Sequence, residues 1–327
     1  MSKQDKPPIY TNRNGPDSEL PHYSSYRNDQ QMYFEGSSPK SWEIVILNRY
    51  FVDGFRIFVS LDAAEKFEVF KKNKAPEVIE LQTAGIGVPI FKAITPLIPL
   101  TTKFLTFRRY VPTNLHPFDI EKDYYNFCTV KKKLHVGYDS FLFDFVPDPN
   151  QPKLNFQIIM FAHSTLPIND YIYNGEKHRW IDESIMRGFR ERFFVKYGFK
   201  HTILGKDQTS LCDSWDGQSE KLDKSMTNPY LKNYLKTKFS LTSRFIKPEY
   251  YGVQITGILG EMEAFFLDTG YAELKLDDIY NTSPYVDYES INSLNIDALV
   301  HICIATCLKR RKDIIEDSRK RSNGGGG

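Results

Sequence analysis

One segment near the C-terminal end limits the folds that are open to this chain. Residues 296–308 read Ile-Asp-Ala-Leu-Val-His-Ile-Cys-Ile-Ala-Thr-Cys-Leu and would be apolar on nearly every face of a helix. A helix that is apolar all round must be buried all round. This one is too short, and with Asp297 and His301 too polar, to span a bilayer. The rest of the chain is therefore expected to enclose a helix from Asn295 to about Arg319, solvated and charged from Lys309 onward.

The segments before this helix predict short β-strands. Aromatic residues make up 14% of the chain, and aromatic residues favour strands. Tight turns are expected at Asp53-Gly54 and at Gly260-Glu261. The predicted strands are Trp42–Leu47, Phe55–Val59, Lys103–Tyr110, Leu134–Val136, Ser140–Phe145, Phe156–His163, Lys177–Ile181, Phe193–Phe199, Thr202–Leu204, Tyr251–Leu259, Met262–Leu267 and Ala272–Leu276. This order predicts a mostly β fold: a closed antiparallel β-barrel of about twelve strands around the hydrophobic C-terminal helix.

Changes in composition divide the chain. Residues 1–40 are polar and nearly lack aliphatic side chains, which predicts a disordered tail. Residues 41–320 form the predicted barrel domain, with a polar insertion at 212–245 that holds a short helix near 230–238. Residues 321–327 are a flexible, glycine-rich terminus. The apolar, proline-rich segment 85–112 is expected to be an extended, partly buried connection, and a loop that dips into a membrane is the alternative.

Composition argues against several classes of protein. The formal net charge of +2 does not favour nucleic acid as a partner. Four cysteines are too few for a disulfide scaffold and are expected to be reduced, buried thiols. The first residues show no apolar stretch of the kind found in secretory signals. These features together predict a cytoplasmic protein, with peripheral attachment to a membrane as a further possibility.

No motif in the sequence predicts catalysis. There is no nucleophile elbow, no zinc-protease helix and no phosphate-binding loop, so His163, His178 and His201 have no recognisable catalytic partner. His301, on the apolar helix, is expected to be a hydrogen-bonded core residue. We therefore expect no catalytic residue, no cofactor and no metal ligand, and a protein that is not an enzyme.

The order of strands and helix resembles the tubby-like superfamily, which includes phospholipid scramblases and LURP-one-related proteins. Three segments carry the likeness: Gly175–Trp180, with a basic residue before a tryptophan; Tyr251–Leu267, similar to a late hairpin; and Asn295–Leu308, similar to the central helix. The resemblance implies a twelve-stranded barrel and phosphoinositide binding through basic barrel residues. The insertion at 212–245 is longer than expected, and no acidic loop matches the scramblase calcium segment, so calcium-triggered lipid movement is not implied.

The tail contains a motif that indicates a partner. Pro7-Pro8-Ile9-Tyr10 fits the PPxY pattern, in which a preformed polyproline II segment and a tyrosine fill two sites on a WW domain. Leu20-Pro21-His22-Tyr23 is a weaker variant that could add avidity. Pro7, Pro8 and Tyr10 are thus predicted to bind a WW-domain ubiquitin ligase of the HECT class. The alternative is a tail that contains these residues by chance.

A second segment suggests contact with lipid. Between residues 187 and 197, cations alternate with aromatic residues, a mixture that suits an anionic head group at a membrane surface. Arg187, Arg190, Arg192 and Lys196 are the predicted contacts, and a strand with a solvated basic face is the alternative.

The sequence thus favours a non-catalytic adaptor that binds anionic phospholipid through its barrel and a WW-domain ligase through its tail. The alternative function is a β-barrel enzyme or small-ligand carrier with an internal pocket, which predicts a cavity lined by polar groups. A purely structural subunit is the third hypothesis.

Overall fold

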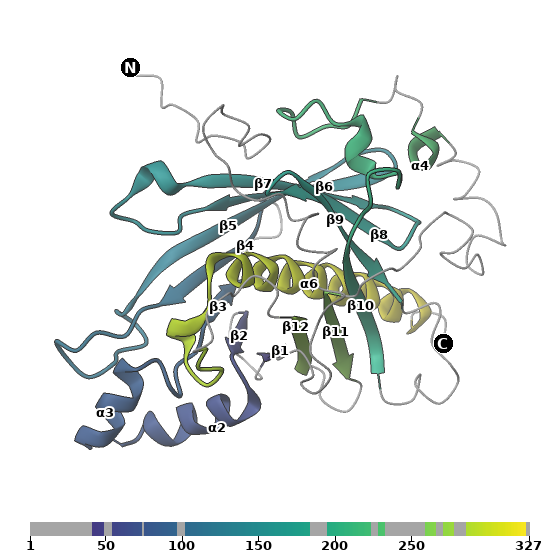
Figure 1. Ribbon diagram of the computed structural model, residues 1–327. Helices are drawn as coiled ribbons and strands as arrows, with labels where there is room; N and C mark the ends of the chain where they lie inside the picture. The colour runs from purple at the N-terminus through teal and green to yellow at the C-terminus, as the bar shows by residue number, and fades with distance from the viewer. Residues whose placement is uncertain are drawn as a thin grey trace, which may run out of the picture.

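The computed structural model describes residues 41–48, 54–73, 75–96, 102–183, 195–223, 228–232, 259–265, 271–277 and 286–324. Within these residues, twelve antiparallel strands form a closed barrel, as predicted (Figure 1). Neighbours in sequence are neighbours in the barrel, and the pairing of β1 with β12 closes it. The strands are β1 (Ser41–Leu47), β2 (Phe55–Phe58), β3 (Phe91–Ile94), β4 (Lys103–Tyr110), β5 (Tyr124–Leu134), β6 (Tyr138–Phe145), β7 (Phe156–His163), β8 (Ile168–Tyr173), β9 (Glu176–Asp182), β10 (Val195–Ile203), β11 (Gly260–Phe265) and β12 (Tyr271–Asp277).

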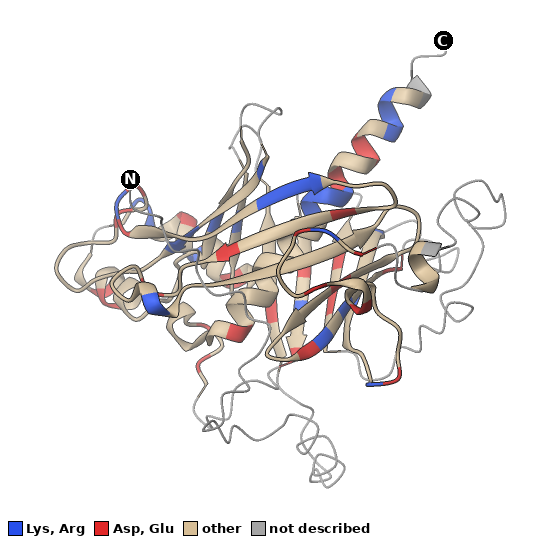
Figure 2. Cartoon of the chain, turned by 90° about the horizontal axis from the view of Figure 1, so that it is seen from above, with Lys and Arg blue, Asp and Glu red and all other residues tan. Residues whose placement is uncertain are grey.

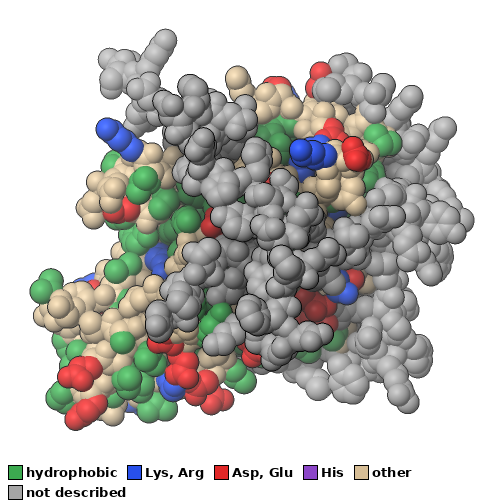
Figure 3. Space-filling model, viewed as in Figure 1, with side chains coloured by type: hydrophobic (Ala, Val, Ile, Leu, Met, Phe, Trp, Pro, Cys, Tyr) green, Lys and Arg blue, Asp and Glu red, His purple; other side chains and the backbone are tan. Residues whose placement is uncertain are grey.

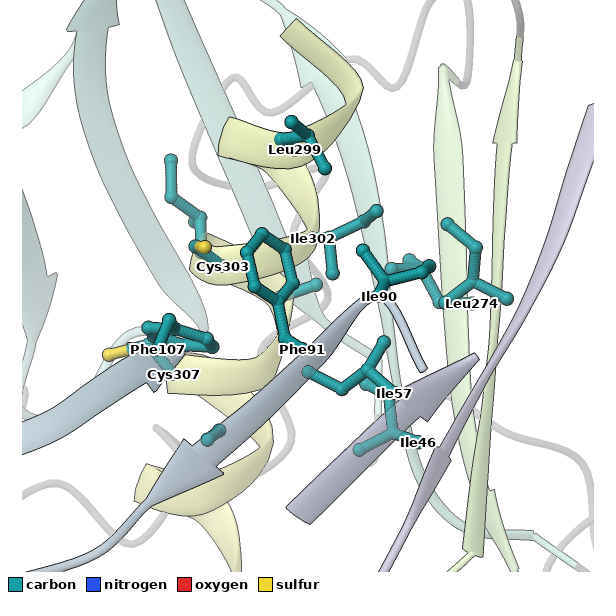
Figure 4. Close-up of a cluster of buried hydrophobic side chains, with 14 of the residues drawn as sticks. Ile46, Ile57, Ile90, Phe91, Phe107, Leu274, Leu299, Ile302, Cys303 and Cys307 are labelled. Carbon is teal, nitrogen blue, oxygen red and sulfur yellow. The ribbon is translucent and has the colours of Figure 1, made fainter. Parts of the chain in front are cut away.

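The C-terminal helix α6 (Ile296–Gly324) runs through this barrel. Asn295 caps it by accepting a hydrogen bond from the backbone N–H of Ala298 at 2.8 Å. Inward side chains of several strands meet the helix, among them Ile57, Phe91 and Phe107 opposite Cys303 (Figure 4). All of these side chains are fully buried, so the barrel encloses the apolar part of the helix on every side, as its sequence requires.

The transition from core to solvent along α6 comes later than the sequence suggests. Lys309 is only 1% exposed: it lies 2.9 Å from Asp313 and over the ring of Phe55. Burial lowers the pKa of Lys309, while Asp313 acts in the opposite direction. The expected solvated start at Lys309 is therefore wrong, because the barrel extends one further turn and an i, i+4 partner compensates the charge. Beyond it, the helix projects from the barrel with mixed charges (Figure 2).

Two outer helices were not anticipated. Helix α2 (Leu61–Phe70) begins after Ser60, whose side chain accepts from Ala63 N, and α3 (Pro76–Thr83) begins at a proline. They lie outside the barrel beside β2 (Figure 1), where Phe67 of α2 packs on Phe58. Their outer surface carries acidic and hydrophobic side chains (Figure 3). Further short helices are η2 (Pro152–Leu154), η4 (Leu211–Ser214), α4 (Pro229–Lys232) and η7 (Ile291–Ser293).

Several local predictions need correction. The strands predicted at Phe193–Phe199 and Thr202–Leu204 are one strand, β10, and β8 was not predicted, while the strand predicted at Tyr251–Leu259 lies almost wholly outside the described residues. Gly260-Glu261 is not a turn but the start of β11, where a Cβ atom on Gly260 would lie 2.9 Å from a methyl group of Leu276. The strand predicted at 134–136 is instead the end of the long β5, which turns at Gly137. The segment 85–112 contains β3 and β4, and its residues 87–91 are buried against protein.

Candidate anion-binding site

Three cations lie side by side on the outer face of the barrel. Lys92 of β3 is paired with Arg56 of β2 on one side and with Arg108 of β4 on the other. The residue next to each of them, Ile57, Phe91 or Phe107, points into the core, and because side chains alternate along a strand, the cations point outward. Neighbouring strands are about 4.8 Å apart, so the three Cα atoms span roughly 10 Å. We call Arg56, Lys92 and Arg108 the cationic row.

The cationic row is held by aromatic rings rather than by acids. The guanidinium of Arg56 lies 5.5 Å from the ring centre of Phe67, and that of Arg108 lies 4.3 Å from the ring centre of Tyr124. The Nε atoms of both arginines are buried without a hydrogen-bond partner. In the described part of the chain, no ion pair or side-chain hydrogen bond reaches any member of the row. The three positive charges are therefore positioned but not neutralised.

A buried tyrosine lies beside the cationic row, with its side chain only 1% exposed. Tyr110 lies two residues beyond Arg108 on β4 and so on the same face, with its ring against Phe118 and Tyr124. Burial raises the pKa of Tyr110 to about 12, although Arg56 and Arg108 act to lower it. The phenol therefore keeps its proton at neutral pH and can donate a hydrogen bond.

This arrangement suits an anion that presents several oxygens. Like charges directly opposite each other on neighbouring strands repel, so the row destabilises the sheet when it is empty. A guanidinium stacked on an aromatic ring keeps its N–H edge available, and that edge matches the oxygens of a phosphate or a carboxylate. Asp62 of α2 is engaged elsewhere, since it lies 2.7 Å from Lys66, which also pairs with Glu289, whereas the charge of Glu121 acts on Tyr110 together with those of Arg56 and Arg108.

Other basic surfaces of the barrel are neutralised by protein. Three consecutive lysines of β5 each have an acidic partner: Lys131 with Asp144 at 2.9 Å, Lys132 with Asp139 at 3.1 Å and Lys133 with Glu220 at 2.7 Å. Arg311 of α6 also reaches Asp139, at 3.4 Å. These lysines lie within a strand rather than in the exposed turn that the sequence suggested, and their charges are already paired.

The residues predicted to bind lipid fall mostly outside the described ranges. Arg187, Arg190 and Arg192 lie there, as do Pro7, Pro8 and Tyr10 of the tail motif. Lys196 is described: it lies on β10, its side chain is 11% exposed, and its Nζ is 3.5 Å from Asp313. The cationic row could not be predicted from the sequence, because its members are far apart along the chain and only the strand register aligns them.

The interior of the barrel bears on the alternative of an enzyme or carrier. Helix α6 fills it, and one pocket at its end is lined by Trp42, His201, Leu259, Leu276, Asp277, Asn295, Ala298 and His301. This pocket has room for about one water molecule. The expectation for His301 is confirmed, since it is buried and its Nδ1 lies 3.0 Å from the hydroxyl of Tyr171.

None of the helices in the described ranges combines the length and the apolar character needed to cross a membrane. A family model described as DIA1 matches residues 39–321, which is most of the chain. No curated protein and no solved structure matches it.

Proposed function

The chain belongs to the DIA1 family, and we propose that it is a non-catalytic adaptor that attaches peripherally to anionic phospholipid and recruits a WW-domain protein. The observation that carries the lipid half is the cationic row: Arg56, Lys92 and Arg108 lie in adjacent register and form no ion pair with an acid among the described residues. The proposal places the protein in the cytoplasm, at a membrane surface.

Phosphate is the anion that the row fits best. Two guanidiniums offer planar N–H edges, and the ammonium of Lys92 lies between them. A head group with more than one phosphate could engage all three cations, because the row is about as wide as two strand spacings. Arg187, Arg190 and Arg192 remain additional proposed contacts, whereas Lys196 is already close to Asp313.

The barrel around a central helix agrees with the fold that a relation to the tubby-like superfamily implies. That relation is part of the proposal, and so is phosphoinositide as the lipid. The filled interior supports a binding module over an enzyme, because α6 occupies the space in which an internal substrate would sit.

Co-sedimentation with vesicles tests the lipid half. The full chain is mixed with phosphatidylcholine vesicles that contain or lack a few per cent of a phosphatidylinositol bisphosphate. The wild type is compared with the triple variant Arg56→Gln, Lys92→Gln, Arg108→Gln. We expect binding only to the anionic vesicles, weakened by salt and lost in the triple variant.

The matched control removes the same charge elsewhere. Lys131, Lys200 and Lys275 lie on strands β5, β10 and β12; Lys131 and Lys200 have acidic partners, and Lys275 is in register with Glu43 and Glu261. The variant with glutamine at these three positions should still sediment with anionic vesicles. If both triple variants lose binding equally, bulk charge rather than the row is responsible.

The tail half of the proposal rests on Pro7-Pro8-Ile9-Tyr10. A pull-down from cell lysate compares the wild type with Tyr10→Ala, and with Tyr26→Ala as a control tyrosine that no proline accompanies. We expect a HECT-class ligase with WW domains in the wild type and in Tyr26→Ala, and its loss in Tyr10→Ala. If Tyr10→Ala retains the same ligase, the PPxY motif is not its binding site.

A further inference from the structure

Three histidines from distant parts of the sequence meet inside the barrel. His178 comes from β9, His201 from β10 and His301 from α6, and each is 1% exposed. Tyr171 of β8 lies directly opposite His178. In the β9–β10 register, His201 is paired with Trp180 and His178 with Ile203, so the two imidazoles are diagonal neighbours on the inner face.

The nitrogens of these rings converge on one point. Nδ1 of His178 lies 3.1 Å from Nε2 of His201, and the hydroxyl of Tyr171 lies 3.2 Å from that same Nε2. The hydroxyl is also 3.0 Å from Nδ1 of His301. One ligand nitrogen from each of the three imidazoles lies within 4.8 Å of the other two. In a tetrahedral zinc site such nitrogens are about 3.3 Å apart, so at least one ring would have to move closer to the other two when a metal binds.

The surroundings favour a ligand role over simple packing. Burial lowers the pKa of His178 to about 3 and those of His201 and His301 well below their ordinary value, so that all three rings are neutral. The layers around them are filled by apolar side chains, and a buried polar group contributes little to stability compared with an apolar one. Three imidazoles and a phenol in this interior are more than hydrogen bonding alone requires.

The pocket at the end of the barrel supplies the remaining coordination position. His201 and His301 form part of its wall, together with Asp277 and Asn295, and it has room for about one water molecule. Three neutral imidazoles and one water are a ligand set typical of a divalent transition metal, zinc above all.

We propose that His178, His201 and His301 bind one divalent transition-metal ion inside the barrel, with Tyr171 hydrogen-bonded beside the ligands and a water from the pocket completing the coordination. Carboxylates take no part in this site, so Mg²⁺ and Ca²⁺ are poor candidates. The inference does not depend on lipid or on the tail motif.

Cobalt provides the test. Tag-free full-length protein is unfolded, refolded with one equivalent of Co²⁺ or Zn²⁺, and desalted, because the site is enclosed. We expect about one metal ion per chain by mass spectrometry, visible Co²⁺ absorption of tetrahedral intensity, and a higher Tm with Zn²⁺ than without it. Refolded protein that retains no metal would overturn the proposal.

Variants assign the ligands. His201→Gln and His301→Gln should lose the metal and the rise in Tm. His163→Gln should retain both, since His163 is a buried histidine whose ring contacts Tyr230 and the loop after β7 instead. If the ligand variants fail to fold, X-ray absorption at the metal edge of the wild type decides: three imidazole ligands support the site, and a shell dominated by oxygen or sulfur contradicts it.

Discussion

Two rows of charged side chains cross the outer face of the same barrel, and they are built in opposite ways. Across β1, β12, β11 and β10, the register aligns Glu43, Lys275, Glu261 and Lys200, so that the charges alternate. Across β2, β3 and β4, it aligns Arg56, Lys92 and Arg108, which carry the same charge. We call the first the alternating row and compare it with the cationic row.

The difference teaches where to look for a ligand. The alternating row is complete within the protein, because each cation has acidic neighbours, and Lys200 lies 3.1 Å from Glu183 as well. In the cationic row, the two arginines lie over the rings of Phe67 and Tyr124 and have no acidic partner within the described ranges. Opposite charges in direct register stabilise a sheet and like charges destabilise it, each by about 0.2–1 kcal/mol. A sheet that keeps three like charges in register is therefore the place where our proposal puts the anion.

The largest effect on lipid affinity is expected when the cationic row is converted to a row of alternating charge. Lys92→Glu places a carboxylate between the two guanidiniums, where it would occupy the position of the anion. Affinity for phosphoinositide vesicles should fall about tenfold or more, since a charge-assisted contact is replaced by repulsion. Co-sedimentation measures this, with Lys275→Glu, which changes the charge equally in the alternating row, as the control. Vesicle binding by Lys92→Glu as strong as that of the wild type would show that the cationic row is not the lipid site.

An intermediate effect on vesicle affinity is expected when an aromatic ring that packs against the cationic row is removed. Tyr124→Leu keeps the strand and the apolar contact but removes the ring beneath Arg108, at 4.3 Å. The guanidinium then loses a cation–π contact of about 0.5–1 kcal/mol, so vesicle affinity should fall by a few fold. Tyr125→Leu, one residue further along β5 and with its hydroxyl bonded to Pro147 O, is the control that should leave affinity unchanged.

The smallest effect is expected on stability without any ligand, and it should have opposite signs in the two rows. Lys92→Gln relieves repulsion and should raise the free energy of unfolding by about 0.2–1 kcal/mol. Lys275→Gln removes attraction to Glu43 and Glu261 and should lower it by a similar amount. Urea unfolding in phosphate-free buffer measures both. If the free energy of unfolding changes in the same direction in both variants, the charges of residues paired across strands do not control stability here.

The sequence was sufficient for the fold because the decisive signals are local. The apolar character of residues 296–308 demands enclosure, and short apolar runs such as 156–163 indicate strands, so the barrel around a helix could be predicted. Helices α2 and α3 were missed because they are short, and Gly260 was assigned to a turn because its close approach to Leu276 leaves no trace in sequence.

The candidate sites could not be predicted, because they depend on register. Arg56, Lys92 and Arg108 are separated by helices and turns, and only the pairing of three strands brings them together. The histidine cluster could not be predicted either, because His178, His201 and His301 come from two strands and the central helix and meet only in the folded interior. By contrast, a basic run that is obvious in sequence, Lys131–Lys133, turned out to be paired with acids.

The most direct test of the cationic row is a calorimetric titration of the full chain with a soluble inositol polyphosphate. Our account predicts one site whose affinity falls with salt, is lost in the triple variant Arg56→Gln, Lys92→Gln, Arg108→Gln, and is unchanged in Lys131→Gln, Lys200→Gln, Lys275→Gln. Absence of binding by the wild type, or equal binding by the two triple variants, would contradict it.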